Sequence, residues 1–423
     1  MTKTKTAIIG SGISGLGAAY CLSKTDDITV FEKKSYTGGH ARTVDVKDGQ
    51  NVIPVDTGFI VFNKQNYPNF LKLLNYFDVP YAKSNMSFGV SIGRGAVEYC
   101  SKHILAQKRN LLRPAFWRML ADIIKFNKKS HAFIDGPASD ISLGEYLDQI
   151  NMGPWFRNYY IQAMGAAIWS SSTQSILDYP AKTFLQFFNN HGLLATDNHL
   201  QWYTILGGSR SYVEKLKDSI NQNIKLNCGV SEVSRQDNKV IILDEHGVSH
   251  EFDRVVFASH ADQTVAMADD LSARELEILS AFKYQRNKTV LHSDHSFMPK
   301  RKKAWASWVY LSEGLKGDAR VSLTYWMNNL QPLNTSLPIL NTMNPDLDPD
   351  ESTVQDRCEF SHPLFNHDAV ENQHKINDIQ GLGNYWYCGA WQGYGFHEDG
   401  LKSALEMVRK MGGRIPFDDA SDH

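Results

Sequence analysis

The sequence predicts an α/β fold in which a domain built around a parallel sheet is assembled from separate segments of the chain and interrupted by an α+β domain. Three observations support this prediction. A strand, a glycine-rich turn, a helix and a second strand occupy the first 32 residues. The same pattern returns after residue 205, and a last strand, glycine-rich turn and helix lie near the C-terminal end. The length of 423 residues allows one large core or two linked ones.

The elements follow from apolar runs and from the turn and cap residues between them. Aromatic-rich helical segments at 155–169 and 180–190, and strand-like runs at 304–311 and 322–327, belong to the interrupting domain. A stretch rich in Pro and Asp at 344–356 predicts a surface loop. The strands expected in the α/β domain lie at 6–10, 28–32, 224–226, 239–243, 254–258 and 384–388, and its helices at 14–23, 209–220 and 401–411.

The first glycine-rich turn has the spacing of a dinucleotide-binding fingerprint. Gly10, Gly12 and Gly15 join the first strand to the first helix, where glycines let backbone N–H groups approach a pyrophosphate at the helix N-terminus. Glu32 closes the second strand 22 residues after Gly10 (32 − 10 = 22), where a carboxylate accepts hydrogen bonds from ribose hydroxyls. A glycine-rich turn beside a solvated glutamate is the alternative, and the combined context favours the nucleotide site.

Two further glycine-rich turns indicate FAD rather than a simple nicotinamide cofactor. Gly38 and Gly39 let backbone donors approach the flavin half of FAD, and Arg42 can neutralise a phosphate or orient the isoalloxazine. Near the C-terminal end, residues 388–404 form a strand, a glycine-rich turn and a helix start that can direct its positive end at the flavin. The alternatives are a surface cation at Arg42 and glycines that serve only close helix packing.

These three blocks together resemble the flavin-containing amine oxidase and phytoene desaturase superfamily. More narrowly, residues 55–63, 190–194, 207–210 and 395–400 are similar to a bacterial subfamily of FAD-dependent proteins associated with fatty-acid modification. The resemblance implies an amine oxidase-like fold and an enzyme acting on acyl chains. That activity includes desaturation of methyl-branched acyl groups on the way to furan fatty acids.

We therefore expect a Rossmann-like FAD-binding domain from residues 1–80, 205–270 and 380–423, and an inserted α+β substrate domain from 81–204 and 271–379. FAD is expected to be non-covalent, because Cys388 lies in the last strand and not in the flavin-linking motif of covalent members. No second fingerprint marks an NAD(P)H domain, so oxygen or another acceptor reoxidises the flavin. The expected cofactor-binding residues are Gly10, Gly12, Ile13, Ser14, Gly15, Glu32, Lys33, Gly38, Gly39, His40, Ala41, Arg42, Thr43, Thr57, Gly58, Val230, Gly389, Gly395, Glu398, Asp399, Gly400, Leu401 and Ala404.

Residues 102–129 combine positive charge with apolar side chains. Eight Lys or Arg residues stand there against a single acid, Asp122, and apolar residues including Trp117 are interleaved at helical spacing after Pro114. Such a segment can lie in the interface of an anionic bilayer and open a route to lipid acyl chains. The alternative is an ordinary amphipathic helix with its basic face in water.

His397, His191 and Tyr394 are the candidate catalytic residues. Oxidation by a flavin removes a hydride, and a base is needed where a proton leaves as well. His397 lies in the turn expected near the flavin, and His191 follows an aromatic helix, so either can accept a proton near neutral pH. Tyr394 can help to wall a substrate slot together with Trp169, Trp202 and Trp391. All of these residues can equally be structural.

The charge balance and the cysteines indicate which partners and which cellular compartment to expect for the protein. The formal charge of −2 gives no general attraction for nucleic acid. The five cysteines are scattered without a Cys-x-x-Cys pair, so neither disulfides nor a metal site are expected. The sequence has no signal segment and no membrane-spanning stretch, which predicts a cytoplasmic protein, peripheral on the inner face of the membrane where residues 102–129 bind lipid.

The sequence thus predicts an FAD-dependent oxidoreductase that desaturates or oxidises a fatty acyl chain of a membrane lipid by hydride transfer to flavin N5. Three alternatives stay open. The first is an amine oxidase acting on a small soluble amine, and the second is a redox-neutral isomerase of fatty-acid double bonds. The third is a non-catalytic FAD-binding partner of another lipid enzyme.

Overall fold

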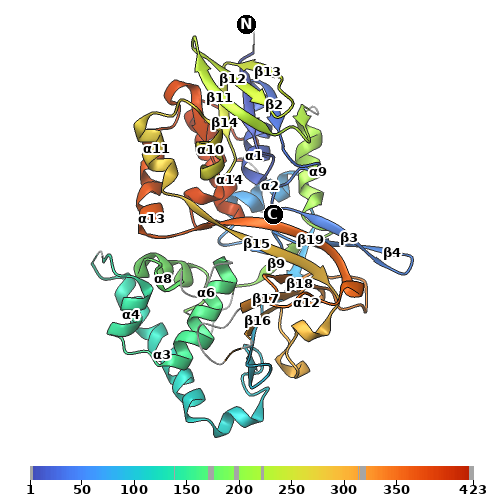
Figure 1. Cartoon of the computed structure of the whole chain (residues 1–423), viewed down its shortest axis with the longest axis vertical. Coiled ribbons are helices and arrows are strands. Elements are labelled where there is room, and N and C mark those ends of the chain that lie inside the picture. Colours follow the sequence, from blue (N-terminus) through green and yellow to red (C-terminus); the bar gives the residue numbers. More distant parts are fainter. Residues whose placement is uncertain are drawn as a thin grey trace.

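The computed structural model describes residues 3–418 except 138, 170–175, 195–199, 221–222, 313 and 315–320. Its upper half in Figure 1 contains a five-stranded parallel sheet with the order β10-β2-β1-β14-β20. Three separated segments of the chain supply these strands, which confirms that one sheet is assembled across the sequence. The strands are β1 (Lys5–Ile9), β2 (Asp27–Phe31), β10 (Ile224–Lys225), β14 (Arg254–Phe257) and β20 (Tyr385–Tyr387).

Helices cover both faces of this sheet, as a parallel sheet requires. Side chains alternate along β1, so Ile8 faces one core while Ala7 and Ile9 face the other. The first core contains α1 (Ile13–Leu22), α2 (Pro68–Tyr76), α9 (Arg210–Ser219) and α14 (His397–Lys410). The second contains α10 (Ala261–Met267) and α11 (Ala273–Ser280). All ten residues of α1 are buried, because α9 and α14 pack directly on it.

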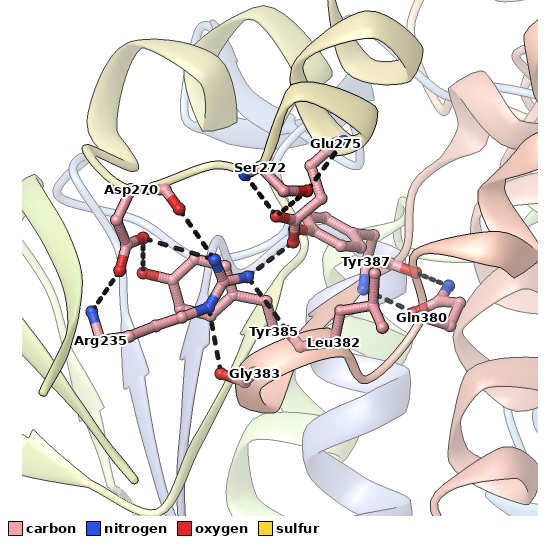
Figure 2. A network of polar contacts seen from close by, with 9 residues as sticks. All are labelled: Arg235, Asp270, Ser272, Glu275, Gln380, Leu382, Gly383, Tyr385 and Tyr387. Carbon is pink, nitrogen blue, oxygen red and sulfur yellow. Dashed lines mark hydrogen bonds and ion pairs between the residues drawn. The ribbon is translucent and has the colours of Figure 1, made fainter. Parts of the chain in front are cut away.

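A small antiparallel sheet lies at the top of Figure 1 and is tied to β20 by a polar network. It consists of β11 (Val230–Gln236), β12 (Lys239–Asp244) and β13 (Ser249–Phe252). Figure 2 shows Arg235 of β11 lying over the ring of Tyr385, 3.6 Å from its centroid. The guanidinium also donates to the buried carboxylate of Glu275 at 2.6 Å, which accepts from Tyr387 Oη at 2.7 Å. The network therefore joins β11, α11 and β20.

The lower half contains a seven-stranded sheet with the order β19-β15-β18-β17-β16-β7-β8 (Figure 1). Only the β7–β16 pair in it is parallel. Its strands are β7 (Phe88–Ile92), β8 (Val97–Cys100), β15 (Lys283–His292), β16 (Trp308–Ser312), β17 (Val321–Trp326), β18 (Leu340–Met343) and β19 (Val354–Leu364). The long β19 and β15 reach from this sheet toward the parallel sheet, so they lie between the two halves of the molecule.

A helical layer with an aromatic core packs against one end of the seven-stranded sheet. Val90, Tyr99 and Tyr310 from the sheet share this core with Phe116, Phe126 and Phe184 from the helices. Proline at the first helical position starts α3, and a capping box at Ser142 starts α4. The helices are α3 (Pro114–Ile134), α4 (Leu143–Gln149), α5 (Pro154–Phe156), α6 (Gln162–Trp169) and α8 (Ala181–Asn190), with a π-helical turn at Arg157–Ile161.

The remaining elements connect these layers. The hairpin of β3 (Thr43–Asp48) and β4 (Asn51–Asp56) projects beside β19, and β9 (Trp202–Ile205) pairs with β5 (Phe62–Asn63) and β6 (Tyr81–Ser84). The others are α12 (Met327–Leu330), α13 (His367–Gln373) and short 3₁₀ turns at Lys108–Leu112, His295–Phe297, Lys302–Ala304, Glu351–Thr353, His374–Asp378, Leu382–Asn384 and Ala390–Gln392. No helix in the described residues is long and apolar enough to cross a membrane.

The predicted α/β class is confirmed, and the differences from the predicted elements are local. The last helix begins at His397 and not at 401, because the carboxylate of Asp399 accepts from the backbone N–H groups of Tyr394 and Phe396 and so caps an earlier start. The expected loop at 344–356 gives way to β19 at Val354, and the strand expected at 304–311 starts only at Trp308. Backbone pairing with β15 and with β7 and β17 decides these bounds, and such pairing is invisible to local sequence patterns. The domain boundaries stay predictions.

Candidate cofactor and substrate site

The first glycine turn leaves open space at the start of α1. A Cβ on Gly15 would lie 1.9 Å from the carbonyl oxygen of Gly10, and Gly10 itself has a φ of +104°. These two glycines are therefore required by the fold. A Cβ on Gly12, by contrast, would meet nothing within 4 Å, and no side chain caps this helix end. The N-terminus of α1 thus faces a space that fits a pyrophosphate group, with Ile13 and Ser14 as the first helical residues.

Glu32 is held at the carboxyl edge of the parallel sheet. Its Oε2 accepts hydrogen bonds from the backbone N–H (3.0 Å) and the hydroxyl (2.6 Å) of Ser11, and its Oε1 accepts from the backbone N–H of Lys34 (2.8 Å). The Glu32 carbonyl accepts from Cys228 just before β11, which places Val230 close to Glu32 and the exposed Lys33. A carboxylate fixed here beside the fingerprint turn fits a ribose diol.

The second glycine turn lies on the first one. The backbone N–H of Gly38 donates to the Ser11 carbonyl at 2.8 Å, and a Cβ on Gly39 would approach Gly12 Cα to 3.1 Å. The turn then continues through His40 and the buried Ala41. A Cβ on Gly58 would lie 2.2 Å from the His40 carbonyl oxygen, so the predicted segments 38–43 and 57–58 are in direct contact.

Arg42 and Thr43 already have partners within the protein. The Arg42 guanidinium makes a two-pronged ion pair with Asp356 of β19 at 2.7 and 2.9 Å, and it also donates to Thr57 Oγ1 at 3.2 Å. Thr43 donates to the buried carboxylate of Asp56 at 2.6 Å. The charge of Arg42 is therefore balanced by Asp356, and its guanidinium joins the glycine turn to the seven-stranded sheet. Phosphate neutralisation by Arg42 stays a prediction that this pairing disfavours.

The third glycine turn places α14 directly on α1. The backbone N–H of Gly389 donates to Ser403 Oγ at 2.9 Å, and Gly395 has a φ of +86°. A Cβ on Gly400 would lie 2.9 Å from Ser14 Oγ, and a Cβ on Gly17 would lie 2.8 Å from Leu401. Ala404 is fully buried in the same contact. The glycines therefore allow close helix packing, and this packing brings the C-terminal turn beside the fingerprint turn.

The two acidic residues of this turn, Glu398 and Asp399, bind backbone N–H groups. The carboxylate of Glu398 accepts from the backbone N–H groups of Asn69 (3.0 Å) and Phe70 (2.9 Å) in the first turn of α2, and burial raises its pKa to about 7. Asp399 accepts from the N–H groups of Tyr394 and Phe396, and burial raises its pKa to about 6. Any contact of these residues with a cofactor must therefore come mainly from their backbone.

His397 is packed as a core side chain. Its ring stacks on Phe59 with centroids 3.8 Å apart, and its Nε2 makes a 2.7 Å hydrogen bond with Tyr212 Oη. Burial lowers its pKa to about 3, so the ring is neutral. This packing favours a structural role, and the predicted catalytic role of His397 stays untested.

His191 and Tyr394, the other two candidate catalytic residues, are brought together in an aromatic cluster. His191 directly follows α8, and its ring stacks on Phe187 with centroids 3.8 Å apart. The ring of Phe187 also lies 5.6 Å from Tyr394 and 5.0 Å from Phe396, in the turn before α14. Trp202 of β9 lies 6.4 Å from His191. The term aromatic cluster is used below for Phe187, His191, Trp202, Tyr394 and Phe396.

The hydrogen bonding of His191 fixes which ring nitrogen can accept a proton. Its Nδ1 lies 2.9 Å from the carbonyl oxygen of Phe187, which can only accept, so Nδ1 carries the hydrogen. Burial lowers the pKa of the ring to about 4, which leaves Nε2 unprotonated near neutral pH. Among the predicted aromatic residues, Trp169 lies 4.7 Å from Phe187. Trp391 instead packs on Phe282 in the other core.

Sequence reasoning missed two histidines beside His40. The ring of His40 lies 6.2 Å from His260, which follows β14, and 5.3 Å from His362 of β19, and it stacks on Phe360. Burial lowers the pKa of all three rings. They lie where the carboxyl edge of the parallel sheet meets β19, which is where this class of sheet binds ligands. No local signal could have joined His40 to residues 220 and 322 positions further along the chain (260 − 40 = 220; 362 − 40 = 322).

A parallel sheet with a fingerprint turn, an acid at the end of β2 and a second glycine turn in contact with the first defines a dinucleotide-binding protein. The chain belongs to the flavin containing amine oxidoreductase family, whose sequence profile matches residues 13–359. This family implies a flavin cofactor, FAD, and oxidoreductase activity. The open space at Gly12 and the position of Glu32 fit the diphosphate and ribose of that cofactor.

Solved structures of known proteins share the fold. Cyclohexylamine oxidase from Brevibacterium oxydans IH-35A superposes with a TM-score of 0.69 at 12% identity, over 97% of this chain and 100% of that one. The CLA-producing fatty acid isomerase from P. acnes gives 0.67 at 15% identity, over 96% and 98%. Wild-type putrescine oxidase bound to putrescine gives 0.65 at 12% identity, over 97% and 99%. No curated protein sequence matches the chain significantly.

Proposed function

We propose that this chain is an FAD-dependent oxidoreductase that desaturates or oxidises a fatty acyl chain, with FAD bound non-covalently. The main support for the proposal is the aromatic cluster. In this cluster the unprotonated Nε2 of His191 lies among apolar rings, beside the turn that precedes α14. Helix α14, which follows that turn, packs on the fingerprint helix through Gly400, so the cluster lies at the C-terminal segment that would complete the cofactor site.

The composition of the aromatic cluster supports an apolar substrate. None of its five members carries a formal charge near neutral pH, since burial keeps His191 neutral. The carboxylate of Asp399, beside Tyr394, already accepts hydrogen bonds from the backbone N–H groups of Tyr394 and Phe396. A protonated amine desolvated here would find that carboxylate engaged, which makes its burial costly. An acyl chain has no such cost, and one protein of this fold is a fatty acid isomerase.

The chemistry divides between the cofactor and the protein. When bound, FAD supplies the acceptor for a hydride, that is two electrons and one proton, from an acyl C–H bond. His191 Nε2 can take the proton of the neighbouring C–H bond, so that a carbon–carbon double bond forms between the two carbons. The rings of the aromatic cluster would pack against the acyl chain.

The environment of Cys388 supports non-covalent binding. Its side chain is fully buried in the core formed by α1 and α14, and this burial raises its pKa, so its thiol is neither exposed nor ionised. Denaturation of the purified protein should therefore release all of its flavin into the supernatant. Flavin that stays with the precipitated chain would contradict this part of the proposal.

The test of the reaction is anaerobic mixing of the FAD-loaded protein with fatty acids or phospholipid, followed by the flavin absorbance and by mass spectrometry of the lipid. Lasting loss of the oxidised flavin band together with a new double bond supports the proposal. Two other results contradict it: a double bond that moves without lasting bleaching indicates an isomerase, and bleaching by small amines alone indicates an amine oxidase. If no lipid or amine reduces the flavin, the chain is a non-catalytic FAD-binding partner.

A further inference from the structure

The segment 102–129 exposes apolar side chains that a water-soluble surface rarely gathers in one place. Among the described residues, thirteen large hydrophobic side chains are exposed, and five of them fall between 105 and 124. Leu112 is 83% exposed, Ile124 65% and Trp117 50%. The other two are Leu105 and Leu111. The term apolar tip is used below for these five side chains.

Four side chains of the apolar tip lie together on the turn before α3 or on one face of that helix: Leu111, Leu112, Trp117 and Ile124. Trp117 Nε1 donates to the carbonyl of Leu111 at 2.9 Å, which holds the indole against the turn that carries Leu111 and Leu112. Trp117 and Ile124 are seven residues apart on α3, so they lie on the same helix face. The core-facing stripe of α3 is a different one, made by Phe116, Met119 and Phe126. The helix therefore has two apolar stripes, and only one of them is covered.

Unpaired positive charge surrounds the apolar tip. Lys102, Lys108, Arg109, Lys125, Lys128 and Lys129 are exposed, and none of these six forms an ion pair within the described residues. The only acid of the segment, Asp122, is buried and accepts from the backbone N–H of Gly153. The term basic ring is used below for the six cations. An apolar surface rimmed by cations is complementary to a bilayer with anionic headgroups.

The position of α3 in the molecule would let the apolar tip and the basic ring reach a bilayer. The beginning of α3, cyan in Figure 1, forms the end of the long axis opposite to the sheet β11–β13. This end can therefore touch a flat surface without interference from the rest of the chain. Helix α8 packs on α3 and carries Phe187 and His191 at its end, so one helix links this end to the aromatic cluster.

We propose that the apolar tip and the basic ring are a docking surface for an anionic phospholipid bilayer, with Leu112, Trp117 and Ile124 inserted at the level of the headgroups. This inference rests on the proposed function, because an enzyme that acts on the acyl chains of lipids needs contact with the bilayer that contains them. The contact itself is measured without turnover, so its failure leaves the proposed reaction untouched, and failure of the reaction leaves the contact untouched.

The test is flotation of the FAD-loaded full chain with vesicles of phosphatidylcholine alone and with about one-third phosphatidylglycerol. We expect binding to the anionic vesicles only, weakened by high salt. The double variant Leu112→Asp/Ile124→Asp should lose at least tenfold in partition coefficient, because charged side chains resist insertion. Each of Lys125→Glu and Lys128→Glu should lose about fivefold or more. The matched controls Leu347→Asp, at a site 61% exposed, and Lys3→Glu, also exposed, should bind as the unchanged protein does.

Three results would overturn the proposal. The first is equal flotation with and without phosphatidylglycerol, or with neither. The second is anionic binding that the cation variants lose while Leu112→Asp/Ile124→Asp keeps it, since that indicates unspecific charge attraction. The third is a dimer in light scattering that the Leu112→Asp/Ile124→Asp variant converts to a monomer, with no vesicle binding, because the apolar tip would then serve a second copy of the chain.

Discussion

Gly400, near the C-terminal end, lies against Ser14 of the first helix so closely that a Cβ on Gly400 would come within 2.9 Å of Ser14 Oγ. This contact joins residues 386 positions apart (400 − 14 = 386). It brings the last glycine turn to the fingerprint turn, where the second turn also touches Gly12. The cofactor site is therefore a product of both chain ends, and perturbing either end should be visible in cofactor binding.

Substitution of two glycines of the fingerprint turn should have different effects, one on folding and the other on FAD binding. Gly15→Ala would put a methyl group 1.9 Å from the Gly10 carbonyl, so we expect loss of folded protein. Gly12→Ala has room for its methyl group, so the chain should fold normally and lose FAD affinity, because the methyl group occupies the space for the pyrophosphate. Circular dichroism and bound flavin per chain distinguish the two. A Gly12→Ala protein with full flavin content would show that the pyrophosphate does not lie there.

Glu32→Gln should weaken FAD binding by roughly 10- to 100-fold, since hydrogen bonds to a charged acceptor contribute about 1.5–3 kcal/mol. Fluorescence titration of the flavin-free protein measures this. The matched control is Glu214→Gln, at an exposed position on α9. Equal affinity in both variants would contradict the role of Glu32 at the ribose.

His191→Gln should lower the rate of flavin reduction, whereas His397→Gln should lower the thermal stability. His191→Gln should slow substrate-dependent flavin reduction by roughly 10²- to 10⁴-fold at unchanged flavin content, because a base is lost. His397→Gln removes a ring stacked on Phe59 and bonded to Tyr212, so it should lower thermal stability while the folded protein keeps its reduction rate. Anaerobic stopped-flow absorbance and thermal unfolding test the pair. The reverse pattern would assign the proton transfer to His397.

The contribution of Glu398 and Asp399 to the stability of the protein should fall as pH rises from about 4.5 to 7. Burial raises the pKa of Glu398 to about 7 and that of Asp399 to about 6. In this window these two carboxyl groups bind more protons in the folded state than in the unfolded state, so their deprotonation favours unfolding. Glu398→Gln should remove a part of the dependence worth roughly 3 kcal/mol. Urea unfolding at several pH values measures it, and an unchanged slope in the variant would refute the assignment.

Arg235→Met should destabilise the fold by about 3–5 kcal/mol, because Glu275, only 1% exposed, is left as a buried charge without its cation (Figure 2). The control Arg274→Met breaks exposed ion pairs with Glu277 and Asp378 and should change the stability little. Denaturant unfolding gives both values. Similar small losses in the two variants would mean that the network in Figure 2 contributes little.

The sequence was most informative where function requires a local pattern. The positions of Gly10, Gly12 and Glu32 beside the start of α1 could be predicted because the fingerprint has a fixed spacing and the turn itself needs glycine. The ion pair of Arg42 with Asp356 and the meeting of His40, His260 and His362 could not be predicted, since both depend on how β19 lies against the parallel sheet. For the same reason, His397 was a candidate base by its place in the turn, while its ring points into the core.

The flavin content of the purified chain tests the central claim most directly. We predict a yellow protein that holds close to one FAD per chain, releases it on denaturation and takes it up again after removal. A colourless protein that binds no added FAD, although it is folded by circular dichroism, would contradict the claim that the glycine turns from both ends of the chain form one cofactor site.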